Sequence, residues 1–345
     1  MSQKRYNVAV IGVGAVGIEM LRALRQRNFP VQELRVFARS GRDIEIDGEK
    51  YSVQAISPEA FDGINIALFA GTEGEKGAAV TYAPEAVKRG AVVIDNGADF
   101  RMHSDVPLVV PEVNPQDIKS HKGIIANPNC STIQMVVALW PIYKKVGIKR
   151  IVVTTLQAAS GAGRGAVEQL NRETSLIASG GCKDIHVNVK DKALPQQIAF
   201  NVFPHLGSFQ EHGYTTEEWK LVKETHKIMH DDKIKISATT VRVPVRTGHA
   251  ESIYIETKKA IAPQQARDIL SQNASAGIIV IDDPVNNLYP MPKDAEGRDE
   301  VFVGRIRSDP FVKNGLWLWV VADNLRKGAA TNAVQIAECL TSSSP

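Results

Sequence analysis

The stretch YNVAVIGVGAVGIEMLRALRQRNF, residues 6–29, decides the fold that this sequence is expected to adopt. It begins with a short apolar strand over 6–12 and ends with a segment over 18–29 whose apolar residues recur at helical spacing. Between the strand and the helix lies a turn that is rich in glycine. A strand, a glycine turn and a helix in this order are typical of the first part of a dinucleotide-binding sheet.

The glycine turn has a physical reason to bind a dinucleotide. Gly12, Gly14 and Gly17 follow the pattern G-x-G-x-x-G, which permits a tight turn and a close approach of the backbone to a pyrophosphate. The pyrophosphate then lies at the N-terminus of the helix, where N–H groups point toward it. Tight packing alone is the other explanation for such glycines. The residues expected to contact the cofactor are Gly12, Val13, Gly14, Ala15, Val16 and Gly17.

The end of the next predicted strand, over 33–39, favours NADP over NAD. Arg39 and Ser40 stand where an acidic residue usually accepts a hydrogen bond from the ribose of NAD. A guanidinium group suits the 2′-phosphate of NADP, so we expect NADP as the cofactor. A surface arginine in a polar loop is the alternative interpretation of Arg39.

The remaining predicted elements divide the chain into two domains. Short apolar strands are predicted over 64–71, 91–97, 108–113 and 123–128, with a helix over 79–90. This alternation indicates a parallel, doubly wound sheet. After about residue 131 the predicted strands are longer and β-branched, over 150–160, 235–245 and 251–259, which is typical of a mixed α+β domain. The polar stretch 180–197 is predicted to form a long loop.

Composition narrows the class of protein. The 345 residues are 43% hydrophobic and 23% charged, which fits a soluble protein of two domains. The formal net charge is +3 without blocks of like charge, so we expect neither nucleic acid nor membrane as a partner. The start of the chain lacks an apolar leader, and no run is long enough to span a membrane. The three cysteines lack metal-site spacing, which favours a metal-free protein of the cytoplasm.

Cys130 and His249 are candidates for covalent catalysis. Cys130 follows Asn-Pro-Asn, and Asn129 can cap a helix that begins near it. A thiol in the first turn of a helix is shifted toward the nucleophilic thiolate, although a buried, inert cysteine is an equally simple reading. In VRVPVRTGHAES (241–252), Arg242 and Arg246 alternate with valines, and His249 follows in a glycine turn. A cysteine with a distant histidine suffices for nucleophilic attack and proton transfer, but a lone histidine in a turn is more often structural.

Several segments together resemble bacterial aspartate-β-semialdehyde dehydrogenases. They are DVPLVVPEVN (105–114), NPNCSTIQ (127–134), QAASGAG (157–163), IAFNVFPH (198–205), EEWKLVKET (217–225), RVPVRTGH (242–249) and VADNLRKGAA (321–330). The resemblance implies an α/β fold with an N-terminal Rossmann domain over 1–131. It also implies a catalytic and dimerisation domain of the glyceraldehyde-phosphate-dehydrogenase type over 132–324, and a C-terminal helix over 325–345 that returns to the first domain.

The resemblance also implies an activity. Members of this family use NADPH to convert L-aspartyl-β-phosphate, through a cysteine thioester, into L-aspartate-β-semialdehyde and phosphate. This reaction serves the synthesis of lysine through diaminopimelate, and of methionine and threonine. A homodimer is expected as the assembly. The glycine turn of this chain is shorter than the G-x-T-G-x-V-G of the family, so the shape of the pyrophosphate site is the least secure part of the comparison.

Residue by residue, the resemblance implies the following roles. Cys130 matches the nucleophile, His249 the acid/base and Gln157 the residue that orients the substrate. The matches for substrate binding are Arg242 for the α-carboxylate, Glu217 for the amino group, and Arg101, Asn129 and Lys220 for the phosphate. The matches for the cofactor are the glycine turn, Arg39, Ser40, Ser160, Gly161 and Asn324. Without the resemblance, Glu217 and Lys220 read as a solvated i,i+3 pair on a helix.

Two other functions are compatible with parts of the pattern. N-acetyl-γ-glutamyl-phosphate reductase shares the chemistry, and ADFR (98–101) partly fits it, but NPNCST and RVPVRTGH do not. A catalytically silent NADP-binding homologue is the alternative from another class, because a fold alone does not establish activity. The joint presence of Cys130, Gln157, Arg242 and His249 argues against a silent protein.

Overall fold

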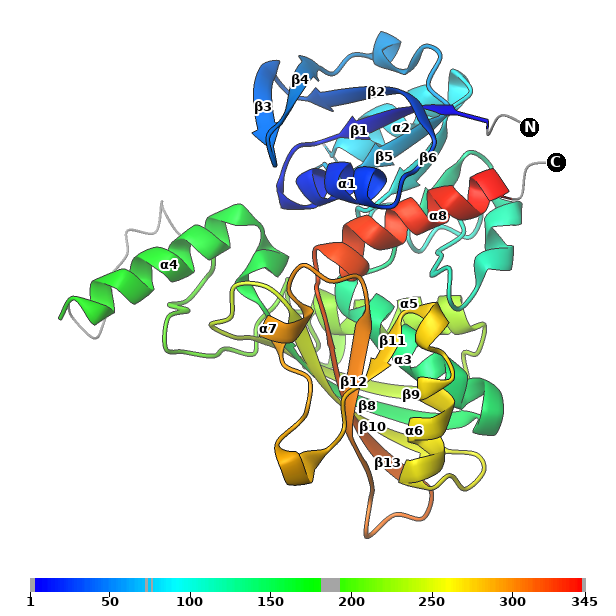
Figure 1. Ribbon diagram of the computed structural model, residues 1–345, viewed down its shortest axis with the longest axis vertical. Helices are drawn as coiled ribbons and strands as arrows, with labels where there is room; N and C mark the ends of the chain where they lie inside the picture. The colour runs from blue at the N-terminus through cyan, green and yellow to red at the C-terminus, as the bar shows by residue number, and fades with distance from the viewer. Residues whose placement is uncertain (1–3, 72–73, 76, 181–192, 343–345) are drawn as a thin grey trace. The chain divides into compact units, whose positions relative to one another are not determined.

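The computed structural model describes residues 4–71, 74–75, 77–180 and 193–342, which form two compact units. Unit 1 consists of Met1–Asn129 with Ala329–Pro345, and unit 2 consists of Cys130–Gly328. Each unit is built on its own sheet (Figure 1). The C-terminal segment therefore belongs to the N-terminal unit, while the chain passes from unit 1 to unit 2 between Asn129 and Cys130.

Unit 1 is a doubly wound sheet, as the sequence predicts. Its strands are β1 (Tyr6–Ile11), β2 (Val31–Ala38), β3 (Arg42–Ile46), β4 (Glu49–Ala55), β5 (Ile66–Phe69), β6 (Val92–Asp95) and β7 (Ile124–Ala126). They follow the order β3-β4-β2-β1-β5-β6-β7, and every neighbouring pair is parallel except β3 with β4. The strand order reverses beside β1, which is where sheets of this kind bind their ligands.

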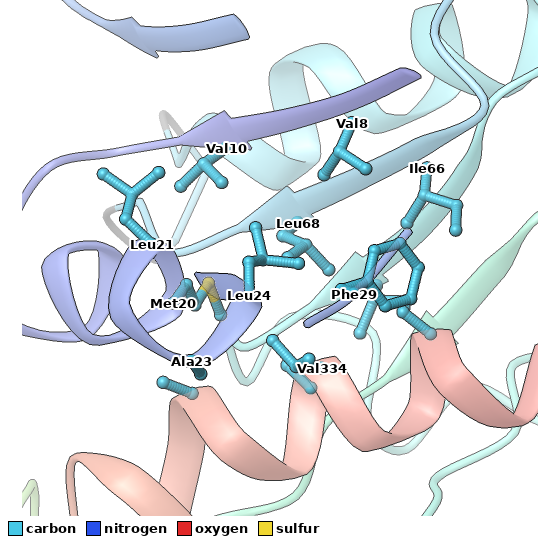
Figure 2. Packing of buried hydrophobic residues seen from close by; sticks show 14 of the residues in the cluster. Val8, Val10, Met20, Leu21, Ala23, Leu24, Phe29, Ile66, Leu68 and Val334 are labelled. Atoms are coloured by element: carbon cyan, nitrogen blue, oxygen red, sulfur yellow. The ribbon is translucent and has the colours of Figure 1, made fainter. Parts of the chain in front are cut away.

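Helices cover both faces of this sheet because its central strands are apolar on both sides. Val8 and Val10 of β1 pack in one cluster with α1 (Ala15–Gln26) and α8 (Thr331–Ser342), including Val334 (Figure 2). Ala9 of β1 packs on the opposite side, in a cluster that includes Ala83 of α2 (Ala78–Lys88). The alternation of β1 thus joins the first and last helices of the chain in one core.

Unit 2 is the mixed domain that the longer strands predict. Its strands are β8 (Ile148–Gln157), β9 (Lys235–Arg242), β10 (His249–Thr257), β11 (Ile278–Val280), β12 (Val301–Ser308) and β13 (Gly315–Ala322), in the order β11-β12-β13-β10-β8-β9. Its helices are α3 (Cys130–Val146), α4 (Arg164–Ala178), α5 (Thr216–Met229), α6 (Pro263–Ser271) and α7 (Pro292–Ala295). Every residue of α3 from Ser131 to Leu139 is buried, so α3 is a central helix of this unit.

The predicted strand over 108–113 is wrong. Within the described residues, Leu108 makes only an isolated bridge with Ala126. The Asn114 side chain accepts from the Val110 N–H and donates to the Leu108 carbonyl, so a side chain satisfies backbone groups that a strand would pair with its neighbour. The run is apolar because Val109 and Val110 are buried.

The segment around His249 also differs from its prediction. β9 ends at Arg242, which is buried, whereas Arg246 is exposed, so these two arginines do not share a strand face. His249 is the first residue of β10 and not part of the preceding turn. Gly248 before it has a φ of +91°, and this left-handed conformation reverses the chain into β10. Of the loop predicted over 180–197, residues 181–192 lie outside the described part of the chain.

Candidate active site

Three predicted site residues form one row at an end of the unit 2 sheet. Gln157 is the last residue of β8 and pairs with Arg242, the last residue of the parallel strand β9. On the other side of β8 the antiparallel strand β10 pairs Ala250 with Leu156, which brings His249 beside Gln157. All three side chains are buried. We call Gln157, Arg242 and His249 the site row.

Cys130 begins α3 and is only partly exposed, as the helix-start interpretation predicts. Arg242 lies near both Cys130 and Glu217: burial lowers the pKa of Arg242, while the charges of Glu217 and Cys130 act in the opposite direction. The guanidinium remains a cation, and its Nη1 donates to the Ala158 carbonyl at 2.6 Å. A cation and a helix N-terminus both favour the thiolate form of Cys130.

His249 is held in one tautomer. The Ala158 N–H donates to His249 Nδ1 at 3.1 Å, so the proton of the neutral ring resides on Nε2. Burial, and then the Arg242 charge, lower the pKa of His249 to about 3. Among the described residues, Nε2 has no hydrogen-bond partner. At neutral pH the side chain is therefore an uncharged imidazole that can donate a hydrogen bond from Nε2.

Glu217 and Lys220 flank the site row from the first turns of α5. Lys220 Nζ lies 3.3 Å from Glu217 Oε2, and the amide of Gln157 donates to Glu217 Oε1 at 3.3 Å. The side chain of Glu217 is only 13% exposed, which does not fit a solvated pair on a helix surface. α5 is oriented by a capping box between Thr215 and Glu218.

Ser160, Gly161 and Asn324 also belong to this unit. A Cβ atom on Gly161 would lie 3.0 Å from both Arg242 Nη1 and His249 Nε2, so a side chain at this position would have to displace these two groups by a few tenths of an ångström. Asn324 Nδ2 donates to Ser160 Oγ at 3.0 Å, and its Oδ1 accepts from the Gly248 N–H at 2.9 Å. Asn324 thereby connects the segment at Gly161 to the turn before His249.

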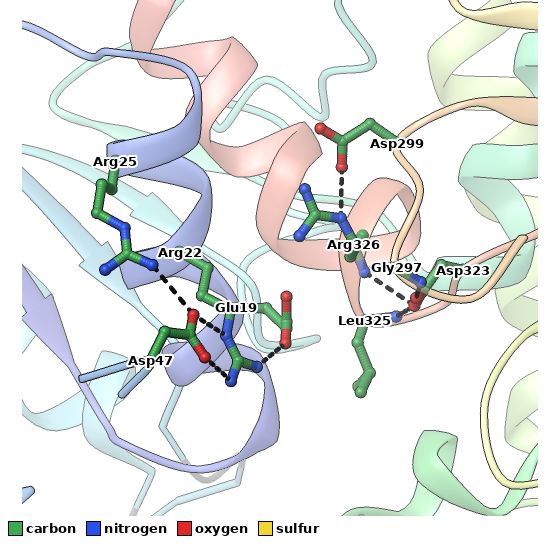
Figure 3. A network of polar contacts seen from close by, with 9 residues as sticks. All are labelled: Glu19, Arg22, Arg25, Asp47, Gly297, Asp299, Asp323, Leu325 and Arg326. Carbon is green, nitrogen blue, oxygen red and sulfur yellow. Dashed lines mark hydrogen bonds and ion pairs between the residues drawn. The ribbon is translucent and has the colours of Figure 1, made fainter. Parts of the chain in front are cut away.

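Gly328 is a residue that the sequence patterns did not select. It lies in the π-helix Arg326–Ala330, and its N–H donates to the Asp323 carbonyl. The Asp323 carboxylate accepts from the N–H groups of Leu325 and Arg326, which holds this turn in place (Figure 3). The glycine in VADNLRKGAA could have identified this position from the sequence, because a glycine inside a helical segment often marks close packing.

In unit 1 the glycine turn fits a bound dinucleotide. A Cβ atom on Gly17 would lie 1.9 Å from the Gly12 carbonyl oxygen, and one on Gly12, whose φ is +99°, would lie 2.7 Å from the Ala70 oxygen. Nothing lies within 4 Å of a Cβ atom on Gly14, so the turn is packed on one side and open on the other. α1 begins at Ala15 without a side-chain cap, which leaves its first N–H groups for an anion.

The other predicted residues of unit 1 are placed as follows. Arg39 and Ser40 are exposed directly after β2, which ends at Ala38. Arg101 is buried and donates to the Asn96 carbonyl, and Asn129 is buried as the residue before Cys130. These four residues are not part of the site row, which lies wholly in unit 2.

The described residues contain no group of three or more His, Cys, Asp or Glu side chains that could hold a metal ion. No helix in the described part of the chain is long and apolar enough to span a membrane.

Comparison with known proteins gives the family. Residues 7–121 match the semialdehyde dehydrogenase NAD binding domain and residues 139–327 the semialdehyde dehydrogenase dimerisation domain. The aspartate-semialdehyde dehydrogenase of Aquifex aeolicus is 56% identical, covering 97% of this chain and 98% of its own, and that of Bacillus subtilis is 49% identical with 97% of each chain covered. The chain belongs to the aspartate-semialdehyde dehydrogenase family.

Solved structures agree with this assignment to the aspartate-semialdehyde dehydrogenase family. The structure of aspartate semialdehyde dehydrogenase II from Vibrio cholerae, complexed with ASA, has a TM-score of 0.91 and 44% identity over 99% of both chains. The family confirms the resemblance and the α/β fold with its nicotinamide-dinucleotide domain and dimerisation domain. Neither alternative, the acetylglutamyl-phosphate reductase or a silent homologue, finds support among these relatives.

Proposed function

We propose that this protein reduces L-aspartyl-β-phosphate to L-aspartate-β-semialdehyde, with NADPH as the reductant and phosphate as the leaving group. The observation that carries the proposal is the site row beside Cys130, within a chain of the aspartate-semialdehyde dehydrogenase family. The product belongs to the synthesis of lysine, methionine and threonine. We further propose a homodimer, supported by the match of 139–327 to a dimerisation domain. A location in the cytoplasm is proposed because the relatives are biosynthetic enzymes.

We infer that the site row, together with Glu217, binds the amino-acid part of the substrate. Arg242 is a buried cation with a planar fork that suits the α-carboxylate. Glu217, already in contact with Gln157, supplies a carboxylate for the amino group. Gln157 then orients the acyl group toward Cys130, and Lys220 supplies a cation for the charge of the phosphate. For Arg101 and Asn129, which belong to unit 1, a role in binding phosphate is proposed from the family resemblance alone.

The covalent step needs a thiolate at Cys130. Its sulfur attacks the acyl carbon, the bond from carbon to the phosphate oxygen breaks with its electron pair, and a thioester remains. A bound NADPH supplies a hydride to the thioester carbon. Collapse of the resulting hemithioacetal releases the aldehyde and returns the thiolate.

His249 supports these steps as a hydrogen-bond donor. Because Ala158 fixes the proton on Nε2, this atom can donate to the oxygen that becomes negative when the acyl carbon is tetrahedral. The low pKa of His249 means that it does not compete with Arg242 as a second cation at neutral pH. Arg242 and the start of α3, and not His249, then account for activation of the thiol.

We assign NADP as the preferred cofactor on the basis of Arg39 and Ser40. The match to an NAD binding domain supports a nicotinamide dinucleotide in general. Arg39 is exposed directly after β2, and its positive charge would attract the 2′-phosphate that only NADP carries. The glycine turn and the Ser160, Gly161 and Asn324 group are the remaining proposed contacts.

The direct test is formation of NADPH from aspartate semialdehyde, measured with and without phosphate. We expect activity that requires phosphate, and a loss of several orders of magnitude in Cys130→Ser because an alcohol is a far weaker nucleophile than a thiolate. Cys339→Ser, in α8, is the matched control and should remain active. Wild-type protein without phosphate-dependent activity, or a fully active Cys130→Ser, would contradict the proposal.

A further inference from the structure

A second polar row lies next to the site row, on the same face of the unit 2 sheet. Its members are Thr155, Thr240 and Glu251, and each lies two residues along its strand from a member of the site row. Side chains two residues apart on a strand point to the same face of the sheet. The register pairs Thr155 with Thr240 on one side and with Glu251 on the other. All three side chains are completely buried. The site row therefore lies next to polar groups that solvent does not reach.

Two members of this second row are connected to the active site or its supports. The amide of Gln157 donates to Thr155 Oγ1 at 3.3 Å, which joins the two rows. The Thr240 N–H donates to Glu218 Oε1 at 3.0 Å, which joins β9 to the capped end of α5. Glu251 is different, because neither of its carboxyl oxygens has a hydrogen-bond partner among the described residues.

Gln134 is the side chain that faces Glu251. It lies one helical turn after Cys130 in α3 and is completely buried, and neither polar atom of its side chain has a hydrogen-bond partner in the described part of the chain. Burial raises the pKa of Glu251 well above its usual range, and the Gln134 side chain is the group that opposes this effect. This direction of the shift favours the neutral carboxylic-acid form of Glu251.

An acid and an amide are complementary in this state. A protonated carboxyl group has one O–H donor and one carbonyl acceptor, and a primary amide offers an acceptor and a donor in return. α3 contacts β10 directly. A bond between these side chains would join the helix that begins with Cys130 to the strand that begins with His249.

We propose that the carboxyl group of Glu251 and the side-chain amide of Gln134 form a reciprocal acid–amide pair that positions Cys130 relative to His249. Glu251 and Gln134 are positioning residues, since neither is placed to touch the substrate. The inference rests on the proposed function, because it assigns the pair a role in the reaction of Cys130.

Two substitutions of Glu251 separate positioning from simple burial. Glu251→Gln keeps a donor and an acceptor facing Gln134, whereas Glu251→Met keeps the volume and removes both. We expect kcat within about threefold of wild type for Glu251→Gln and about a hundredfold lower for Glu251→Met, with little change in KM. In the free protein, the rate at which iodoacetamide alkylates Cys130, followed by mass spectrometry against pH, should be shifted only in Glu251→Met.

An exchanged pair and a distant pair serve as controls. Gln134→Glu combined with Glu251→Gln exchanges acid and amide, and should restore the alkylation profile that Gln134→Glu alone disturbs. Glu173 on α4 is another buried acid that pairs with a glutamine, Gln169, at 2.8 Å. Glu173→Met should lower the melting temperature without moving the alkylation profile of Cys130.

The outcomes are distinct. A folded Glu251→Met protein with wild-type kcat and wild-type alkylation would overturn the proposal, and so would an exchanged pair as impaired as Gln134→Glu. If Glu251→Met does not fold, the kcat of Glu251→Gln and the alkylation profile of the exchanged pair decide whether the proposal holds or is overturned. The alkylation assay needs no substrate, so it tests the pair even if phosphate-dependent turnover, and with it the proposed function, fails.

Discussion

A Cβ atom on Gly328 would lie 2.9 Å from the Cβ of Cys130. The first and the last residue of unit 2 are thus in direct contact, so the backbone at Gly328 packs against the nucleophile. Such a distance is too short for two carbon atoms, and a Cβ atom is not the mobile end of a side chain. Any larger residue at position 328 must therefore displace Cys130 or the turn that Asp323 holds.

The substitution Gly328→Ala should lower kcat by about a hundredfold, because a misplacement of the nucleophile by about 1 Å costs about that factor. The conformation of the glycine turn and of Arg39 should not change, since these residues belong to unit 1. Steady-state kinetics and the alkylation rate of Cys130 measure the effect. Wild-type kinetic constants and a wild-type alkylation rate would contradict this prediction, because they would show that the turn around residue 328 shifts and the thiol does not.

Replacement of Arg242 by lysine keeps the charge and removes the planar fork. If the α-carboxylate is bound by two hydrogen bonds, substrate binding should weaken by roughly 2 kcal/mol. Arg246→Lys is the matched control, because Arg246 is exposed and lies on the same segment. Equal kinetic constants for Arg242→Lys and wild type would remove Arg242 from the substrate site.

The buried imidazole of His249 predicts a loss of stability in acid. Its pKa falls from 6.5 to about 3 on folding, so the unfolded chain binds a proton in this interval and the folded protein does not. The contribution of the neutral His249 to the free energy of unfolding is complete above pH 6.5. It is lost as the pH falls toward 3, with a slope of about 1.4 kcal/mol per pH unit. His249→Gln should unfold with a shallower dependence on pH in this window. Parallel curves of unfolding free energy against pH for the two proteins would contradict the assignment.

Removal of the Arg39 side chain should separate the two nicotinamide cofactors. Arg39→Ala is expected to weaken NADP binding far more than NAD binding, because only NADP carries a 2′-phosphate. The difference should shrink as salt is added, since Arg39 is exposed and its charge is screened. Titration calorimetry with both cofactors measures this. Equal losses for NADP and NAD would make Arg39 structural, and a wild-type preference for NAD would defeat the cofactor assignment.

Sequence patterns predicted those elements whose conformation is determined by residues that lie close together in the chain. The turn of Gly12, Gly14 and Gly17 follows from backbone conformation and close approach, which a short stretch of sequence encodes. The start of α3 at Cys130 could likewise be predicted from a capping residue and apolar spacing. The predicted strand over 108–113 was wrong because burial alone makes a segment apolar, and the bonds of Asn114 that replace strand pairing leave no periodic signal.

The second polar row could not be predicted from local sequence patterns, because its burial depends on the register of three strands that are far apart in the sequence. A signal for Glu251 was nevertheless present. In HAESIYIET, Glu251 alternates in phase with Ile253 and Ile255, both completely buried, so an acid stands where the pattern requires an apolar residue. A charged residue in phase with core positions predicts a buried carboxyl group.

The boundary between Asn129 and Cys130 has an evolutionary consequence. The nucleophile and every residue proposed to recognise the amino acid are encoded by one continuous segment, Cys130–Gly328, whereas the glycine turn and Arg39 are encoded before it. Changes in the glycine turn and in Arg39 can therefore arise in the first part of the gene without altering the segment that encodes the nucleophile and the proposed contacts to the amino acid.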